Sequence, residues 1–272
     1  MKIALVDNGS LEAAAHAGLR AAAHAIGGRA EASVEAVSWR HSDRIPSYAL
    51  EGGPALTLVP WVRDHVAAGE REFVFIPFFI SPQGAIGSSL RRDILALQEE
   101  AGGFDFSFAD GLAADLLAAI VAERVREASA SAGLGRPPVI VVDHGGPLRA
   151  SAEVRDHVAD AARVLLLGDV ARLSAASMES PDGPEFDFNR PLLADALLSP
   201  GFNSADVVVA PLFLAPGRHA GPGGDLFRIS REAEARSAGL RCHFTGLVGT
   251  HPLAIEHLAS SLAKALSVGA TP

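Results

Sequence analysis

Short apolar runs rich in β-branched residues alternate along the chain with longer segments in which Ala and Leu recur at helical spacing. This pattern predicts eight strands and eight helices in alternation. The expected strands are residues 2–7, 34–39, 73–79, 104–108, 139–143, 174–178, 207–213 and 241–247. The expected helices lie near residues 11–26, 54–68, 88–101, 111–129, 150–167, 190–198, 224–238 and 252–267. Such alternation predicts an α/β fold whose parallel sheets carry helices on both faces.

The chain also repeats itself after about half of its length. The turn Asp7-Asn8-Gly9 corresponds to Asp143-His144-Gly145, and FIPFFISP at 75–82 corresponds to VAPLFLAP at 209–216. Eight strand–helix units could close into one barrel. The matched halves favour two four-stranded sheets instead, in an N-terminal half at 1–130 and a C-terminal half at 138–272. The Ser-, Gly- and Pro-rich segment SASAGLGRPP at 129–138 is the expected boundary.

Composition narrows the classes of function. A net charge of −9 argues against a broad nucleic-acid interface. The lone Cys242 allows no internal disulfide, which favours a reducing cytoplasm, and its place in an expected strand favours a core position over a nucleophile. The N-terminal apolar run is too short for a signal peptide, and no run is long enough to span a membrane.

Candidate chemistry follows three strands of the second half. Ligands bind outside the carboxyl ends of parallel strands, and His144, Glu179 and His219 lie in the loops after 139–143, 174–178 and 207–213. Imidazole and carboxylate together suit a first-row divalent metal ion. Each histidine could instead cap a helix or bond a carbonyl, and Glu179 could be a solvated loop acid. In the first half, Asn8 and Ala85 stand where His144 and His219 stand.

Three ordered motifs in the second half resemble those of a known family. They are VIVVDHGGPLRASAEV at 139–154, VVVAPLFLAPGRHAG at 207–221 and LVGTHPLAIEHLASSLAKAL at 247–266. Together they resemble the class II tetrapyrrole chelatases of the CbiX/SirB type. The resemblance covers nearly the whole second half and, more faintly, the first.

The resemblance implies two flavodoxin-like halves with a cleft between them. It implies insertion of Co2+, Fe2+ or Ni2+ into sirohydrochlorin or a related tetrapyrrole, without ATP or an organic cofactor, in cobalamin- or siroheme-type biosynthesis. His144 and His219 would be catalytic and hold the metal, and Glu179 would assist as a base or an orienting group. Three departures stand out: Gly146 replaces a serine, the spacing from His219 to Asp225 is long, and the first half has lost its histidines.

The tetrapyrrole is the expected partner, gripped by loops at 78–88 and 212–224. The substrate carries many carboxylates, which arginines pair well, so Arg91 or Arg92 could join the arginines below as clamps. Phe78 and Leu212 would add apolar contacts. The other expected substrate-binding residues are Asn8, Phe79, Gly145, Gly146, Arg149, Phe213, Leu214, Gly217 and Arg218.

Two other functions stay open. The degenerate first half also fits a non-catalytic metal or tetrapyrrole carrier or sensor on the same fold. A periplasmic-type binding protein fits less well, because it would need an export signal. One chain with two halves suffices as a monomer, and a homodimer remains compatible with the sequence.

Overall fold

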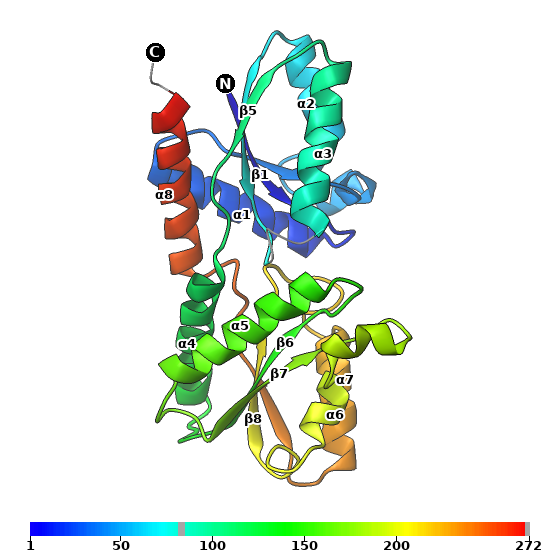
Figure 1. Cartoon of the computed structure of the whole chain (residues 1–272), viewed down its shortest axis with the longest axis vertical. Coiled ribbons are helices and arrows are strands. Elements are labelled where there is room, and N and C mark those ends of the chain that lie inside the picture. Colours follow the sequence, from blue (N-terminus) through cyan, green and yellow to red (C-terminus); the bar gives the residue numbers. More distant parts are fainter. Residues whose placement is uncertain (81–84, 270–272) are drawn as a thin grey trace. The chain divides into compact units, whose positions relative to one another are not determined.

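The alternating pattern folds into two separate parallel sheets, each covered by helices (Figure 1). The computed structural model describes residues 1–80 and 85–269, and their side chains apart from those of 85–88 and 268–269. Unit 1 comprises Met1–Leu112 together with the segment that begins at Pro252, and unit 2 comprises Ala113–His251.

Unit 1 is built on a five-stranded parallel sheet with the order β3-β2-β1-β4-β5. Its strands are β1 (Lys2–Asp7), β2 (Glu35–Ser38), β3 (Leu56–Thr57), β4 (Glu72–Pro77) and β5 (Asp105–Phe108). Its helices are α1 (Ala13–Ala30), α2 (Leu58–Ala67), α3 (Ala85–Glu100) and α8 (Pro252–Gly269), with 3-10 helices η1 (Ser42–Arg44) and η2 (Ser47–Ala49). Helix α1 packs beside α8 and α2 beside α3. The right-handed crossover rule puts α1 on one face of the sheet and α2 and α3 on the other.

Unit 2 has a four-stranded parallel sheet with the order β7-β6-β8-β9. Its strands are β6 (Pro138–Asp143), β7 (Arg172–Ser177), β8 (Asp206–Pro211) and β9 (Arg241–Phe244). Its helices are α4 (Ala114–Ser131), α5 (Arg149–Leu165), α6 (Leu193–Leu197) and α7 (Asp225–Arg236), with the 3-10 helix η3 (Pro184–Asn189). Helix α4 packs beside α5, and α6 beside α7. All six residues of β6 are buried, as expected for a central strand with covered faces.

The structure confirms the fold class and the eight expected strands, and it favours two halves over a closed barrel. One detail is corrected, because unit 1 has a fifth strand, β3, in a range expected to be helical. Its two residues pair with Val37 and Ser38 before the chain turns into α2. A strand this short leaves no periodic pattern in a sequence.

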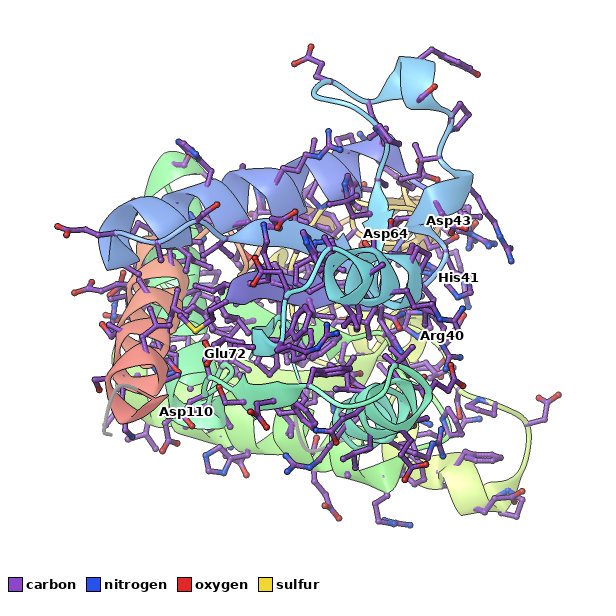
Figure 2. The ribbon with its side chains drawn as sticks, turned by 90° about the horizontal axis from the view of Figure 1, so that it is seen from above. Arg40, His41, Asp43, Asp64, Glu72 and Asp110 are labelled. Atoms are coloured by element: carbon purple, nitrogen blue, oxygen red, sulfur yellow. The ribbon has the colours of Figure 1, made fainter. Side chains whose placement is uncertain are left out.

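The compact units do not follow the linear ranges 1–130 and 138–272, because the last helix of each range packs elsewhere. Helix α4 belongs to unit 2, whereas α8 belongs to unit 1. In unit 1, Lys264 of α8 lies 3.8 Å from the carboxylate of Asp110, which is labelled in Figure 2, and His257 Nε2 lies 3.0 Å from the Gly111 carbonyl. The apolar faces of the two helices look alike in sequence, so only packing decides which sheet each one covers.

The two cores differ in character. Aromatic rings dominate unit 1, where Trp61, Phe73 and Phe75 contact one another edge to face or stacked. Aliphatic residues dominate unit 2, with Ile140 and Val142 of β6 fully buried. None of the helices in the described part of the chain has the length and apolar character needed to cross a bilayer.

The packing of α8 predicts which unit a core mutation destabilises. Leu258 of α8 and Leu117 of α4 are both fully buried. Both tryptophans, Trp39 and Trp61, lie in unit 1, so their fluorescence reports the unfolding of that unit. We expect Leu258→Ala to lower the free energy of unfolding of unit 1 by about 2–5 kcal/mol, measured by urea titration.

Leu117→Ala is the matched control. It should destabilise unit 2, seen by circular dichroism, with a smaller effect on the tryptophan transition. The reverse pattern would show that α8 supports unit 2.

Candidate metal-handling site

His144 is the first residue beyond β6, on a turn that follows the strand end closely. Backbone bonds run from Met178 N–H to the Asp143 carbonyl (2.8 Å) and from Glu179 N–H to the His144 carbonyl (3.1 Å). Gly145 has a φ of +84°, and a Cβ on it would lie 1.9 Å from the Glu179 carbonyl oxygen. Only glycine fits there, so the turn lies tightly against the end of β7.

His219 lies on the loop that connects β8 to α7. The loop is compact, since Gly221 N–H donates to the Gly217 carbonyl (2.8 Å) and Leu226 N–H to the His219 carbonyl (3.1 Å). Asp225 is the first residue of α7 and accepts a hydrogen bond from His219 Nδ1 at 2.7 Å. The long spacing from His219 to Asp225 therefore still lets the carboxylate reach the imidazole.

The structure brings the two predicted histidines together. Their ring centroids are 4.6 Å apart at an interplanar angle of 83°. Each Nδ1 is engaged, that of His219 by Asp225 and that of His144 by the Gly145 carbonyl at 3.0 Å. Histidines that bind metals characteristically donate their second ring N–H to a carboxylate or a backbone carbonyl. Both Nε2 atoms are then left as lone-pair donors for a metal ion.

Glu179 approaches the pair without completing a three-ligand cluster. Its Oε1 lies 3.7 Å from His144 Nε2, and its side chain is 59% exposed. Across residues 1–80 and 85–269, no set of three or more His, Cys, Asp or Glu side chains is arranged to hold a metal ion. The described site is therefore a two-imidazole site with an exposed carboxylate within reach, which suits an ion that must be handed on.

The Asp225 carboxylate is stabilised in its charged form. The hydrogen bond from His219 lowers the pKa of Asp225 first, and the bond from Arg228 (3.2 Å) adds to it. A carboxylate that stays ionised keeps the proton of His219 on Nδ1 and leaves Nε2 free. Arg218, the expected carboxylate clamp, lies 3.8 Å from the same Asp225 and is 79% exposed.

The expected substrate-binding residues fall into two groups. Phe213 lies near the histidines, with its ring 6.5 Å from that of His144. Arg149 follows the His144 turn at the start of α5, and its guanidinium stacks 4.8 Å over the Phe188 ring. Leu214 and Gly217 shape the His219 loop through backbone bonds. Phe78, Phe79 and Leu212 are instead core residues with 3–4% exposure, so they are not offered to a ligand in this structure.

Part of the expected grip lies in unit 1 or outside the described residues. The loop expected at 78–88 includes residues 81–84, which are outside the described part, as is the Ala85 side chain. Arg91 stacks 5.6 Å from the Phe108 ring, and Arg92 lies 3.7 Å from Asp93. These contacts leave the carboxylate-clamp role of both arginines a prediction.

Unit 1 repeats the turn without the chemistry. Asn8 is exposed after β1, and a Cβ on Gly9 (φ +89°) would lie 1.7 Å from the Arg40 carbonyl oxygen. Arg40 and His41, labelled in Figure 2, follow β2 where Glu179 and Ser180 follow β7. Arg40 is paired with Asp93 at 3.0 Å, so the degenerate half presents a cation where unit 2 presents a carboxylate.

The sequence did not indicate the buried polar groups at the strand end that precedes His144. Asp143 is buried and accepts a hydrogen bond from the Ser177 hydroxyl at 2.6 Å, and the buried Arg155 lies 3.6 Å from the same carboxylate. Burial raises the pKa of Asp143, and Ser177 and Arg155 oppose the shift. Arg155 sits in an ordinary helical pattern, so nothing in the sequence distinguishes it from a surface arginine.

Cys242, expected in the core, lies on β9. Burial raises the pKa of its thiol to about 12, consistent with a core role.

No protein-family model and no curated protein matches the sequence. Solved structures do match. SirB from Bacillus subtilis with Fe3+ has a TM-score of 0.67 at 14% identity, with 99% of this chain and 98% of that chain covered. The sirohydrochlorin chelatase SirB from Bacillus subtilis subspecies spizizenii in complex with cobalt gives 0.64 at 14%, with the same coverage. CbiX, described as the terminal enzyme for biosynthesis of siroheme in denitrifying bacteria, gives 0.63 at 19%, with 97% and 99% covered.

The chain has the chelatase fold. The match spans both units and nearly the full length of each neighbour, so the fold expected from three motifs in the second half holds for the whole chain. Identities below 20% leave the activity to be argued from the site itself.

The close approach of Gly145 to the Glu179 carbonyl predicts that a methyl group at position 145 will disturb the His144 turn. We expect Gly145→Ala to displace the His144 turn from the Glu179 carbonyl, lowering both the thermal stability of unit 2 and the affinity for Co2+. Gly168 is the matched control, because it has a φ of +94° and no neighbouring atom within 4 Å of the point where a Cβ would lie. Gly168→Ala should cost only the left-handed backbone penalty of about 1–2 kcal/mol and leave Co2+ affinity unchanged. Equal effects of both substitutions on Co2+ affinity would contradict this account.

The half-buried carboxylate of Asp7 in unit 1 predicts a pH dependence. Burial raises the pKa of Asp7 to about 6, against hydrogen bonds from Ser38 and the Gly9 N–H. Because the folded pKa lies above the unfolded value, the contribution of Asp7 to the stability of unit 1 is fully present below about pH 4 and is lost as pH rises through about 6. We expect a loss of about 2 kcal/mol, allowing for partial exposure. Urea titrations followed by tryptophan fluorescence from pH 4 to 8 measure it.

Asp7→Asn should flatten this pH profile, because the amide keeps the acceptor oxygen without the charge. Asp64→Asn, on the exposed side of α2, is the control and should preserve the profile. A profile that survives Asp7→Asn would assign the pH dependence to another group.

Proposed function

We propose that the protein inserts a divalent metal ion, Co2+, Fe2+ or Ni2+, into sirohydrochlorin or a closely related tetrapyrrole. The reaction uses neither ATP nor an organic cofactor, and the protein works in the cytoplasm. One observation carries the proposal: two imidazoles lie 4.6 Å apart with both Nδ1 atoms engaged, at the carboxyl edge of a sheet. The chelatase fold of the whole chain supports it.

The reaction exchanges one M2+ ion for the two N–H protons of the macrocycle. His144 and His219 bind the ion through Nε2 and replace part of its water shell, so that a ring nitrogen can displace one imidazole at a time. Two monodentate ligands hold the ion less firmly than a closed four-ligand site. The metal can therefore leave the protein for the macrocycle without an external energy source.

The released protons need acceptors close to the metal. Once the metal leaves, the freed Nε2 atoms are bases suited to neutral pH. Glu179, 3.7 Å from His144 Nε2, receives a proton from His144 or orients its ring. The exposed position of Glu179 lets it pass that proton to water.

Recognition of the substrate draws on the rim of the same edge. Arg149, at the start of α5, is exposed and rests on the Phe188 ring, which leaves its donors open to a substrate carboxylate. The half-buried Phe213 offers an apolar surface beside His144. Gly145 and Gly146 carry no side chains that would keep a flat ring from the turn. Arg218 has a competing partner in Asp225, so its contribution is expected to be the smaller one.

The second candidate function is a carrier or sensor that binds the metal or the tetrapyrrole without turnover. The degenerate first half favours it, because the exposed Asn8 turn offers no second metal-binding set among the described residues of unit 1. It shares every binding residue with the chelatase, so turnover alone separates the two.

Anaerobic incubation with sirohydrochlorin and Co2+, Fe2+ or Ni2+, followed by absorbance, tests the proposal. We expect insertion above the uncatalysed rate with at least one metal, and a loss of about 100-fold or more in His144→Ala and His219→Ala. His157→Ala is the matched control, because His157 is an exposed histidine of unit 2 on α5.

Tight metal or tetrapyrrole binding without turnover would establish the carrier instead. Full rates in both site variants, with insertion in the wild type, would move the reaction to another part of the chain.

A further inference from the structure

The turn that carries His144 contains two consecutive glycines, which makes its geometry dependent on outside contacts. Gly145 and Gly146 both have positive φ angles, and glycine leaves such a backbone free to change conformation. His144 itself is exposed. Its imidazole is oriented by the Gly145 carbonyl, which lies 3.0 Å from Nδ1. The orientation of this one peptide unit therefore sets the direction of Nε2.

Asn189, the last residue of η3, holds that peptide unit. Its Oδ1 accepts a hydrogen bond from Gly146 N–H at 3.2 Å, and its Nδ2 donates to the Gly146 carbonyl at 2.9 Å. The N–H of Gly146 and the carbonyl of Gly145 belong to the same planar peptide. A continuous chain of bonds thus runs from Asn189 through this peptide to the His144 ring.

Asn189 is itself fixed from several sides. It is 1% exposed, and its Nδ2 also lies 3.1 Å from the Phe186 carbonyl. The buried Arg155 donates to the carbonyl of Phe188, the preceding residue, at 2.9 Å. Arg155 also contacts Ser177 and Asp143 at the ends of β7 and β6. The asparagine is therefore held in register with the strand that presents His144.

Unit 1 has a comparable clamp made by a different residue. Ser42 Oγ accepts a hydrogen bond from Ser10 N–H at 3.1 Å and lies 3.0 Å from the Ser10 carbonyl. Ser10 corresponds to Gly146 in the repeat. Both halves thus hold the same residue of the turn through its N–H and its carbonyl, even though only unit 2 has a histidine at the preceding strand end to orient.

We infer that Asn189 is a positioning residue for His144: through the Gly145–Gly146 peptide it holds His144 Nδ1–H on the Gly145 carbonyl and Nε2 beside His219. This inference rests on the proposed function, in which the two imidazoles hold the substrate metal. It assigns no contact between Asn189 and the metal or the macrocycle.

Three variants test it: Asn189→Ala, Asn189→Asp and the control Asn203→Ala, which alters a half-buried asparagine of unit 2 outside the site. Asp keeps an acceptor for Gly146 N–H but turns a carboxylate towards the Gly146 and Phe186 carbonyls. It should therefore destabilise the fold at least as much as Ala while preserving the His144 orientation better. The measurements are thermal unfolding, Co2+ titration by visible absorbance, and the His144 tautomer by imidazole 15N NMR.

We expect Asn189→Ala to weaken Co2+ binding about 10-fold or more and to shift His144 away from the Nδ1–H tautomer. Asn189→Asp should fall between Ala and the wild type in both readouts, and Asn203→Ala should match the wild type. If Ala does not fold, retention of the Nδ1–H tautomer in Asp supports the inference and its loss overturns it.

Co2+ affinity that merely follows thermal stability, or does not change in Asn189→Ala, overturns the inference and leaves the proposed function standing. If the wild-type protein binds Co2+ through the histidines but inserts no metal, only the proposed function is contradicted. The Co2+ titration and the His144 tautomer still report on the role of Asn189. Wild-type protein that binds none of Co2+, Fe2+ and Ni2+ overturns both.

Discussion

The pairing of β6 with β7 on one side and β8 on the other is the constraint on which the site depends. Parallel strands end at the same edge of a sheet, so the loops that follow these three strands are neighbours. His144, Glu179 and His219 are 75 positions apart along the chain at their extremes, yet this pairing places them together. The close approach of Gly145 to the Glu179 carbonyl then brings the His144 and Glu179 loops into contact.

Once the strand ends are fixed, hydrogen bonds on the far side of each imidazole decide its chemistry. Asp225 and the Gly145 carbonyl each engage an Nδ1 atom, which directs both Nε2 lone pairs outward. The number of ligands in the site bears on how firmly it would hold a metal ion. In the proposed reaction two imidazole nitrogens would hold a first-row ion, and the lack of a third ligand among the described residues would keep that ion exchangeable. The proposed transfer of the metal to a macrocycle would need such an exchangeable ion more than it would need high affinity.

The two halves show how one backbone plan supports different contents. Both turns have a glycine against a neighbouring carbonyl, an aspartate at the strand end and a polar side chain that holds the residue after the glycine. The aspartate is buried in unit 2 and half-buried in unit 1. In unit 2 the aspartate meets Arg155, whereas Asp7 in unit 1 has no cation among the causes of its raised pKa. The turn is thus a structural feature of the fold, and unit 2 has a histidine at the strand end where unit 1 has Asn8.

Local patterns in the chain were enough to predict the fold class and every strand except β3, from β-branched runs and helical spacing. Glycine-flanked histidines after strands proposed His144 and His219 for the site, and the structure places their rings together. They also marked Asn8 as the degenerate counterpart of His144. Packing in three dimensions was needed to place α4 and α8 in units other than their linear halves. The apolar face of a helix does not specify which sheet it will cover. Packing also buried Phe79 and Leu212, which a strand-end position had suggested for the ligand, and it brought Asn189 and Arg155 to the His144 turn. Their contacts join residues tens of positions apart, and no local pattern encodes such a meeting.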